Sequence, residues 1–423
     1  MNKRFMMKSV LACVLGIGML AACGSNQGGG GGGAKKHDIE LKVWAAEAVK
    51  DLTQQQANAW AAAIKESDGK DVGVTVQAVG EGDAASNMIT DVQAGADIFC
   101  FAQDQLARLK SAGALQEITD ANLKAAVRAE NDDVSYAAAC VDDALVAYPL
   151  TSDNGYFMYY DKSVLPDATV LDNMTTLIAA VKAAGKKIYF DLEGSAWYNA
   201  AFFYGFGCES TWTTNTQGQF TNYVDTYNSN EGVKACKAMY ELMTEDTVYV
   251  SGSSASEAFA SDAAVCISGT WDSASVKTAL GANMGAADLP SVTVGDTTVH
   301  LGSFIGCKLM GVKPQTSAEK NAYAQSLART LSGKDAQLAR YNSNGWGPSN
   351  LQAQQDEAVK NDVALVALRA QNEYATVQGQ YPGDWWTSAK AIASSVRTSD
   401  GSDRAIKAIL QTYEATIDSY ING

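Results

Sequence analysis

The sequence has 423 residues, of which 47% are hydrophobic and 19% charged, and its formal net charge is −15. This length is more than one hydrophobic core usually organises, so we expect two lobes. Nucleic acids and anionic membrane surfaces favour partners with clusters of Lys and Arg, so neither is expected to bind a chain this acidic.

The first 22 residues have the pattern of a secretory signal peptide. Lys3, Arg4 and Lys8 precede an apolar run over 9–20, which is too short for a membrane-spanning helix. The run ends in Leu-Ala-Ala-Cys at Cys23, which resembles the lipobox of bacterial lipoproteins. The resemblance implies cleavage before Cys23, acylation of that cysteine (palmitate or a similar chain) and attachment to the outer face of the cell membrane. The alternative is an ordinary signal peptide in which Cys23 is incidental.

Residues 23–37 are predicted to be a tether. They contain six consecutive glycines and cannot bury enough surface to fold. A Gly-rich chain of this length has a root-mean-square span of about 20 Å, which leaves a globular body free to move above a bilayer.

From residue 38 on, short apolar runs alternate with helical patterns. Strands are predicted at 40–44, 72–79, 97–101, 156–160 and 187–192, and helices at 52–67, 84–94, 103–112, 174–184, 231–243, 317–341 and 403–421. Strands separated by helices of this length indicate an α/β fold with parallel sheets. Ligands of such sheets bind beyond the carboxyl ends of strands. Polar and aromatic residues follow the predicted strands at Trp44, Phe101, Gln103, Asp104, Glu193 and Trp271.

The cysteines and histidines carry little sign of a metal site. Two histidines, His37 and His300, and the absence of any Cys-x-x-Cys motif make zinc improbable, and we expect no metal or cofactor. Six cysteines remain beyond the signal peptide and lipobox: Cys100, Cys140, Cys208, Cys236, Cys266 and Cys307. Because most of them lie in apolar runs that predict buried strands, we favour buried free thiols, with a disulfide framework as the alternative.

The aromatic residues point to a carbohydrate ligand. Sugars combine an apolar C–H face with hydroxyl groups, so their sites need flat aromatic rings and planar polar side chains. Of the 8 Trp residues, several fall in predicted loops, notably Trp271, Trp346 and the pair Trp385-Trp386. The alternative for the pair is that both fill an interface between lobes. Trp60, in a helical pattern, is predicted to be a core residue, and Trp212 is ambiguous.

Five segments carry a family resemblance. They are GADIFCFAQDQLARLKSAGALQEIT (95–119), AYPLTSDNGYFMYYDKSVLP (147–166), SEAFASDAAVCISGTWDSAS (256–275), YNSNGWGPSN (341–350) and YPGDWW (381–386). In this order they resemble the maltose/maltodextrin-binding proteins of ABC importers. The resemblance implies two α/β lobes joined by a hinge that the chain crosses three times. It places 38–151 and 303–344 in the N-terminal lobe, and 152–302 and 345–423 in the C-terminal lobe.

The resemblance also implies site residues. In the first lobe they are Phe101, Asp104 and Gln105, where the family usually has Trp, Asp and Arg, and the first crossing adds Asp153. The second lobe adds Glu193, with Trp197 or Tyr198 beside it, then Trp271, Trp385 and Trp386. Lys390 lies near a position that usually holds Arg, and the loop 45–47 matches a ligand loop poorly.

The function implied is capture of malto-oligosaccharides by a lipid-anchored monomer that delivers them to ABC permease subunits. It would not be an enzyme. Three alternatives stay open: a secreted glycoside hydrolase, the same fold with another ligand (an oligosaccharide, polyol, peptide or metal chelate), and adhesion or polysaccharide capture without transport. A hydrolase would need two carboxylates about 5–10 Å apart across its cleft.

Overall fold

The computed structural model describes residues 37–141, 143–215 and 217–422. The predicted signal peptide, the lipidated Cys23 and nearly all of the predicted tether lie outside these residues. From Asp38 onward the chain groups as one unit, and its strands form two separate five-stranded sheets.

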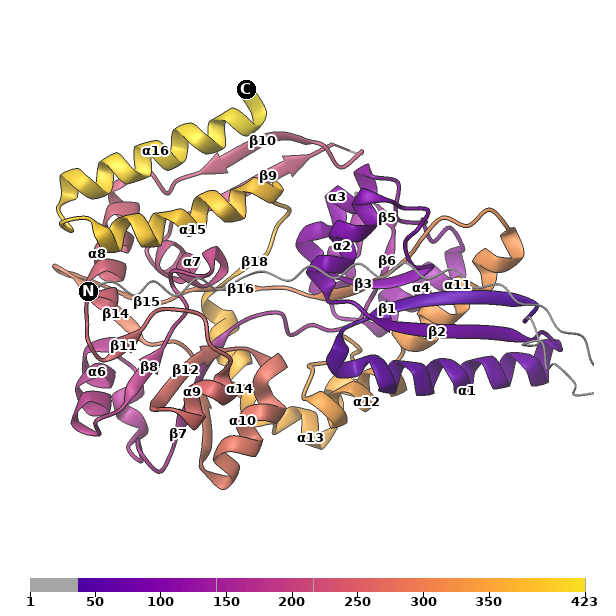
Figure 1. Cartoon of the computed structure of the whole chain (residues 1–423), viewed down its shortest axis with the longest axis horizontal. Helices are drawn as coiled ribbons and strands as arrows, with labels where there is room; N and C mark the ends of the chain where they lie inside the picture. The colour runs from indigo at the N-terminus through magenta and orange to yellow at the C-terminus, as the bar shows by residue number, and fades with distance from the viewer. Residues whose placement is uncertain (1–36, 142, 216, 423) are drawn as a thin grey trace, which may run out of the picture. The chain divides into compact units, whose positions relative to one another are not determined.

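The first sheet has the strand order β2-β1-β3-β17-β6 (Figure 1). β1 pairs in parallel with β2 and β3, whereas β17 runs antiparallel to β3 and β6. The parallel part confirms the βαβ pattern predicted from the sequence, and the antiparallel strand is the one contributed by a later part of the chain. The strands are β1 (Ile39–Ala45), β2 (Val72–Ala78), β3 (Ile98–Ala102), β6 (Ala147–Pro149) and β17 (Lys308–Val312).

Helices pack around this sheet to form the first lobe. α1 packs along β2 and against α11, and α2 packs against β3. Trp60 of α1 is buried, as predicted, and its indole N–H donates to Ser326 at 3.1 Å. The predicted helix 317–341 is two helices that break at Gly333. The helices are α1 (Lys50–Asp68), α2 (Glu81–Thr90), α3 (Leu106–Ser111), α4 (Ala121–Glu130), α5 (Asp133–Ala138), α11 (Ala318–Leu331) and α12 (Lys334–Asn344), with a small hairpin of β4 (Cys140–Val141) and β5 (Ala144–Leu145).

The second sheet has the order β11-β8-β12-β7-β13. β8 pairs in parallel with β11 and β12, and β7 runs antiparallel to β12 and β13. The strands are β7 (Phe157–Asp161), β8 (Lys187–Tyr189), β11 (Val248–Tyr249), β12 (Ala263–Ser268) and β13 (Met284–Ala287).

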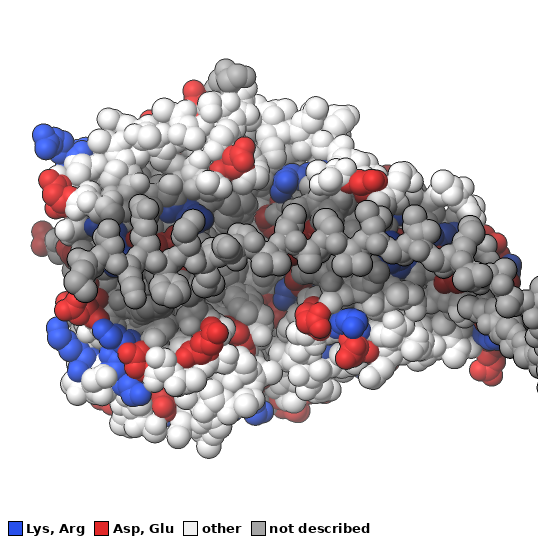
Figure 2. All heavy atoms as spheres, in the orientation of Figure 1, with Lys and Arg blue, Asp and Glu red and all other residues white. Residues whose placement is uncertain are grey.

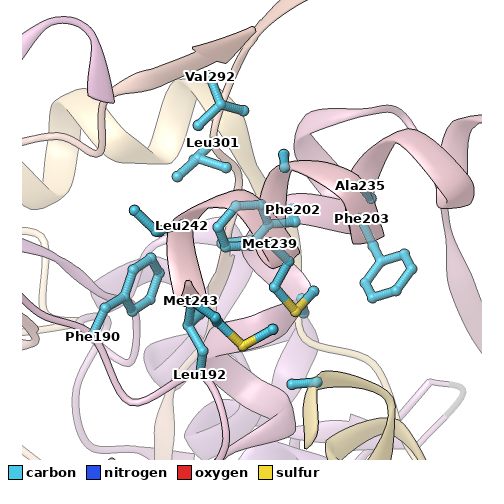
Figure 3. Packing of buried hydrophobic residues seen from close by; sticks show 14 of the residues in the cluster. Phe190, Leu192, Phe202, Phe203, Ala235, Met239, Leu242, Met243, Val292 and Leu301 are labelled. Atoms are coloured by element: carbon cyan, nitrogen blue, oxygen red, sulfur yellow. The ribbon is translucent and has the colours of Figure 1, made fainter. Parts of the chain in front are cut away.

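The core of the second lobe lies between its helices and this sheet. Figure 3 shows Phe202 of α7 and Met239 and Leu242 of α8 packing together, and all three are buried. The helices are α6 (Met174–Ala183), α7 (Ala196–Gly205), α8 (Asn230–Met243), α9 (Ala255–Ala260), α10 (Ser273–Leu280), α13 (Glu357–Lys360), α14 (Val363–Gln371), α15 (Gly383–Thr398) and α16 (Asp403–Asn422).

Two antiparallel hairpins and one parallel strand pair complete the second lobe. The pair joins β16 (Ser303–Ile305) and β18 (Ala375–Val377), and the hairpins are β9 (Ser210–Thr214) with β10 (Phe220–Asp225), and β14 (Ser291–Val294) with β15 (Thr297–His300). Trp212 of β9 stacks on Tyr223 of β10, with ring centroids 4.9 Å apart, and α16 packs against β10. Trp212 is therefore a packing residue of the hairpin.

Within the described residues the chain passes between the two sheets three times: after β6, before β17 and after α12. The three segments are bonded to each other, because Asn154 N–H donates to Gly306 O and Ser152 N–H donates to Gly347 O, both at 3.0 Å. Phe304 of β16 packs into the core of the second lobe. The second passage therefore lies at 306–307, slightly later than the boundary at 303 predicted from the sequence.

The remaining sequence features concern cysteines, metals and charge. The six cysteines are free thiols, five of them buried and Cys140 half-buried, as favoured above. Residues 37–422, leaving out 142 and 216, contain no cluster of three or more potential metal-ligating side chains. Over the same residues, no helix combines the length and apolar character that a membrane span needs. On the face shown in Figure 2, the visible acidic and basic side chains are interspersed.

Candidate functional site

Four tryptophans line a cavity of about 510 Å³. It is lined from both lobes and from the segments that join them. We call it the tryptophan cavity. Its lining residues are Ala46, Ala48, Glu81, Asn154, Trp197, Trp271, Lys308, Trp346, Gln378 and Trp386.

Three of the four tryptophans belong to the second lobe, and each is positioned by the end of an element. Trp197 is in the first turn of α7, where its N–H donates to the N-cap hydroxyl of Ser195 at 3.2 Å. Trp271 lies in a short 3-10 helix directly after β12, and Trp386 lies in the first turn of α15. The Trp197 and Trp271 rings are 5.5 Å apart, and Phe304 contacts both Trp197 and Trp386. These rings form one connected aromatic wall.

Two other lining residues of the cavity, Glu81 and Lys308, carry charge. Lys308, at the start of β17, is 7% exposed, and its ammonium lies 3.8 Å from the ring centroid of Trp346. This is a cation–π contact, which stabilises a charge that has lost much of its water. Glu81, at the start of α2, has its Oε1 buried without a hydrogen-bond partner among the described residues. A buried oxygen without a partner is costly, so a ligand hydroxyl that donates to it would bind favourably.

Gln378 connects the cavity to the segments between the lobes. Its side-chain oxygen accepts from the Trp197 indole N–H at 3.2 Å and from the Asn154 amide at 3.4 Å. Its backbone N–H donates to Ile305 O at 2.8 Å, and its carbonyl accepts from the Gln103 side chain of the first lobe. Gln378 therefore holds Trp197 in a fixed orientation and ties that orientation to the first lobe.

The structure brings three of the predicted site residues, Trp197, Trp271 and Trp386, into this cavity. Phe101 and Asp104 are not among its lining residues. Phe101 is fully buried in the first lobe's core, as are the three residues of β3 that precede it. Asp104 is 5% exposed, and burial raises its pKa to about 7, while the hydrogen bond from Gln105 acts in the opposite direction.

Gln105 is a partner of other side chains rather than part of the lining. It donates to Asp104, and its oxygen accepts from Arg108 at 2.7 Å. The short 3-10 helix after β3 begins at Gln103 and places these residues against the segment that leads to α15, since Gln380 donates to Gln103 O at 2.8 Å. Phe101, Asp104 and Gln105 are therefore not among the residues that line the tryptophan cavity, and their part in sugar binding stays a prediction.

Asp153 joins the lobe-connecting segments. It is fully buried, and its Oδ2 accepts from Thr270 Oγ1 and from Gly347 N–H, both at 2.6 Å. A Cβ at Gly347 would lie 2.7 Å from the Asp153 Cβ, so only glycine fits there. Asp153 thus acts as a structural tie, and its neighbour Asn154 is the residue that reaches the cavity.

The remaining predicted residues of the second lobe are held elsewhere. Trp385 is fully buried and its indole N–H donates to Tyr413 at 2.9 Å, because consecutive residues of α15 point to different sides of the helix. Glu193 accepts from Arg397 at 2.5 Å. Tyr198 lines a neighbouring cavity. The sequence does not decide which residue of the pair Trp385-Trp386, or of the pair Trp197-Tyr198, lines the cavity. That depends on the side of the helix to which each residue points.

Sequence reasoning missed several lining residues. The sequence pattern places Trp346 in a loop but gives no motif that assigns it to the site, and the loop around Ala46 matches a ligand loop poorly. Glu81, Asn154, Lys308 and Gln378 carry no motif of their own. Lys308 lies at the first position of an apolar strand, which is the one local signal that could have drawn attention to it.

Comparison with known families identifies the family of the chain. The profile described as "Bacterial extracellular solute-binding protein" matches residues 59–367, which is most of the chain. The chain belongs to this family of bacterial extracellular solute-binding proteins. Comparison with curated proteins gave no match.

Solved structures of similar fold cover nearly the whole solute-binding chain. A maltodextrin-binding protein from L. casei, solved without ligand, has a TM-score of 0.76 at 22% identity and covers 89% of this chain and 98% of that one. The GacH receptor of Streptomyces glaucescens, solved unliganded and with acarbose, has a TM-score of 0.75 at 16% identity, covering 91% and 100%.

A third similar structure is the maltose-maltodextrin-binding protein of Alicyclobacillus acidocaldarius, with a TM-score of 0.71 at 18% identity, covering 89% of this chain and 100% of that one. At such identities the likeness concerns the fold. It confirms the predicted two-lobed α/β architecture of the periplasmic-binding-protein type for this solute-binding protein.

Proposed function

We propose that this solute-binding protein captures malto-oligosaccharides, the α-1,4-linked glucans, and delivers them to an ABC permease. The observation that carries the proposal is the tryptophan cavity. Its indole rings suit the C–H faces of glucose units, and Glu81, Lys308, Asn154 and Gln378 supply acceptors and donors for hydroxyl groups. Proteins of similar fold include ones solved in complex with acarbose, maltotetraose or maltose, which supports the same ligand class.

Capture would follow from the division of the cavity between the lobes. A glucan that stacks on Trp197, Trp271 and Trp386 while it contacts Glu81 and Lys308 bridges two separately folded sheets. The glucan would bind more tightly to the arrangement in which it contacts both lobes at once. This difference in affinity would shift the equilibrium between the lobe arrangements toward that one. The bonded segments around Asn154, 306–307 and Gly347 are the positions where such a motion would concentrate.

We propose binding without hydrolysis. Retaining and inverting glycosidases place two carboxylates on either side of the scissile bond. Among the described lining residues of the tryptophan cavity, Glu81 is the one carboxylate. Incubation with maltohexaose should therefore leave the sugar intact, and the appearance of shorter products would contradict this part of the proposal.

Isothermal titration against maltose, maltotriose and longer glucans tests the ligand class, with cellobiose and a polyol as competing ligands. We expect Trp197→Ala and Trp271→Ala each to weaken maltotriose binding by about 1–3 kcal/mol, the scale of a buried aromatic contact. Trp212→Phe, in the β9–β10 hairpin outside the cavity, is the matched control and should bind as the wild type does. A wild-type protein that binds no α-1,4-glucan would refute the proposal.

The lipid anchor is a separate part of the proposal and rests on the lipobox resemblance at Cys23. Cys23→Ser should move the protein from the membrane fraction to the soluble fraction, because a protein without acyl chains at residue 23 lacks the stable anchoring that these chains supply. Cys140→Ser is the control that keeps the lipobox, and it should sediment with membranes. Sedimentation of the Cys23→Ser protein with membranes would argue against acylation there.

A further inference from the structure

Arg340, in the second half of α12, carries a buried charge for which the sequence features and the site described above give no use. Its side chain is 2% exposed and is one of the largest side chains buried in the described residues. Within those residues, its Nε and Nη2 are buried without a hydrogen-bond partner. A buried cation with unused donors is costly, so Arg340 needs a charge of opposite sign nearby.

Gln337, on the same face of α12, shows a contrast with Arg340. It lies one turn earlier and is also buried, but both atoms of its amide have partners. Its Nε2 donates to Ser332 O at 2.7 Å and to Ser349 Oγ at 3.0 Å, and its Oε1 accepts from Asn350 N–H at 2.9 Å. This face of α12 therefore meets the segment that follows the third passage between the lobes. Gln337 ties the helix to that segment by hydrogen bonds, and Arg340 adds a charge beside it.

Asp153 is the charge of opposite sign. It is fully buried, and its Oδ1 has no hydrogen-bond partner among the described residues. Burial lowers the pKa of Arg340 to about 10, while the Cys100 thiol and the Asp153 carboxylate act in the opposite direction. Arg340 therefore stays protonated at neutral pH. Because burial raises the pKa of Cys100 to about 12, that thiol is neutral there, and Asp153 is left as the charged partner. Removing either charge would leave the other buried and uncompensated.

Asp153 connects this charge to the tryptophan cavity. Its Oδ2 accepts from Thr270 Oγ1 and from Gly347 N–H, both at 2.6 Å. Thr270 directly precedes Trp271, and Gly347 directly follows Trp346. Both tryptophans line the cavity, Trp271 from the second lobe and Trp346 from the third passage. One carboxylate therefore holds the backbone beside two of the rings, and binding depends on how firmly such supporting groups hold the residues that contact a ligand.

We propose that Arg340 is a positioning residue for glucan binding. Its charge holds the Asp153 carboxylate in place, and Asp153 in turn sets the position of Trp271 relative to Trp346. The inference rests on the proposed function and adds to it a residue that contacts no sugar but determines how well the cavity fits one. The role depends on charge, so Arg340→Lys should retain the affinity that Arg340→Met loses.

Calorimetric titration with maltotriose tests this role. Arg340→Met keeps a long side chain and removes the positive charge, and Asp153→Asn keeps the shape and removes the negative one. Each should weaken binding about tenfold, whereas Arg340→Lys should stay within about threefold of the wild type. The variant with both Arg340→Met and Asp153→Asn should bind about as well as Asp153→Asn alone, because residues that act as a unit give losses that do not add.

Lys313→Met is the matched control. Lys313 is another buried cation of the first lobe, 9% exposed, and its ammonium lies 3.9 Å from the Asp97 carboxylate. Neither residue lines the tryptophan cavity. Loss of this charge should lower the midpoint of thermal unfolding and leave the affinity for maltotriose unchanged. The control therefore separates a general loss of stability from a loss of position in the cavity.

The affinities decide the role of Arg340. Wild-type affinity in Arg340→Met, or single losses that multiply in the double variant, would overturn the inference and leave the proposed function standing. If Arg340→Met does not fold, the double variant, which carries neither buried charge, takes its place. A further loss of about tenfold in the double variant relative to Asp153→Asn would then overturn the inference.

Tryptophan fluorescence of the ligand-free proteins decides the same question without a sugar. Arg340→Met and Asp153→Asn should shift the emission spectrum in the same direction, and Lys313→Met should leave it unchanged. A wild type that binds no glucan would overturn the proposed function, and the emission spectra would still test the position of the rings. An unshifted spectrum of folded Arg340→Met would overturn the inference.

Discussion

The two lobes contribute different chemistry to the tryptophan cavity. The second lobe supplies an aromatic wall of Trp197, Trp271 and Trp386, whose rings are connected through each other and Phe304. The first lobe supplies Glu81 and the Lys308–Trp346 pair. Neither lobe alone has both the ring surface and the charged groups that a sugar site combines. Recognition of a sugar would therefore require both lobes.

The largest expected effect separates the two adjacent tryptophans of α15, Trp385 in the core and Trp386 in the cavity. Trp385→Ala should lower the free energy of unfolding by about 3–5 kcal/mol, because it empties a fully buried space. Trp386→Ala should cost much less stability and should instead weaken glucan binding. Chemical denaturation and calorimetry of both variants measure the two effects. Equal losses of stability would contradict the division between core and cavity.

The next effect concerns Asp104, one of the three first-lobe residues that the family resemblance placed in the site. Because burial raises its pKa to about 7, the folded state keeps the proton over a pH range where the unfolded state has released it. The stability that this carboxyl contributes is complete below about pH 4 and is lost as the pH rises through 7. Asp104→Asn should therefore gain stability relative to the wild type over that range, by up to about 4 kcal/mol.

Urea denaturation at several pH values measures this difference, with the exposed Asp246→Asn as the control whose profile should follow the wild type. Parallel profiles of the Asp104→Asn and wild-type proteins would show that Asp104 is not a buried titrating group. Such a result would restore it as a candidate on the polar side of the cavity.

The smallest effect tests the charged side itself. Lys308→Met keeps the aliphatic stem and removes the ammonium, and should weaken maltotriose binding by about 1.5 kcal/mol, the scale of a hydrogen bond to a charged group. The loss should be similar at low and high salt, because the proposed ligand is neutral. A loss that disappears at high salt would instead indicate a charged ligand.

The sequence predicted the fold, and it named three of the ten residues that line the tryptophan cavity as site candidates. Strand and helix periodicity gave the α/β pattern, and loop tryptophans such as Trp271 were found because a strand end is visible in the sequence. The burial of Trp385 and Phe101 could not be predicted, because burial depends on which side of an element meets a neighbour, and sequence adjacency does not specify that. Lys308 and Gln378 could not be predicted, since they reach the cavity through contacts between segments far apart in the chain.

The free thiols determine how this protein responds to a reductant and how the unfolding of its lobes can be measured. Burial raises the pKa of Cys100 and Cys266 to about 12, so both stay protonated and react slowly while the native packing persists. With no disulfide among the described cysteines, a reductant should leave the native fold intact. Alkylation of these sulfur atoms would then occur only when the chain opens, and its rate would record how often each lobe unfolds.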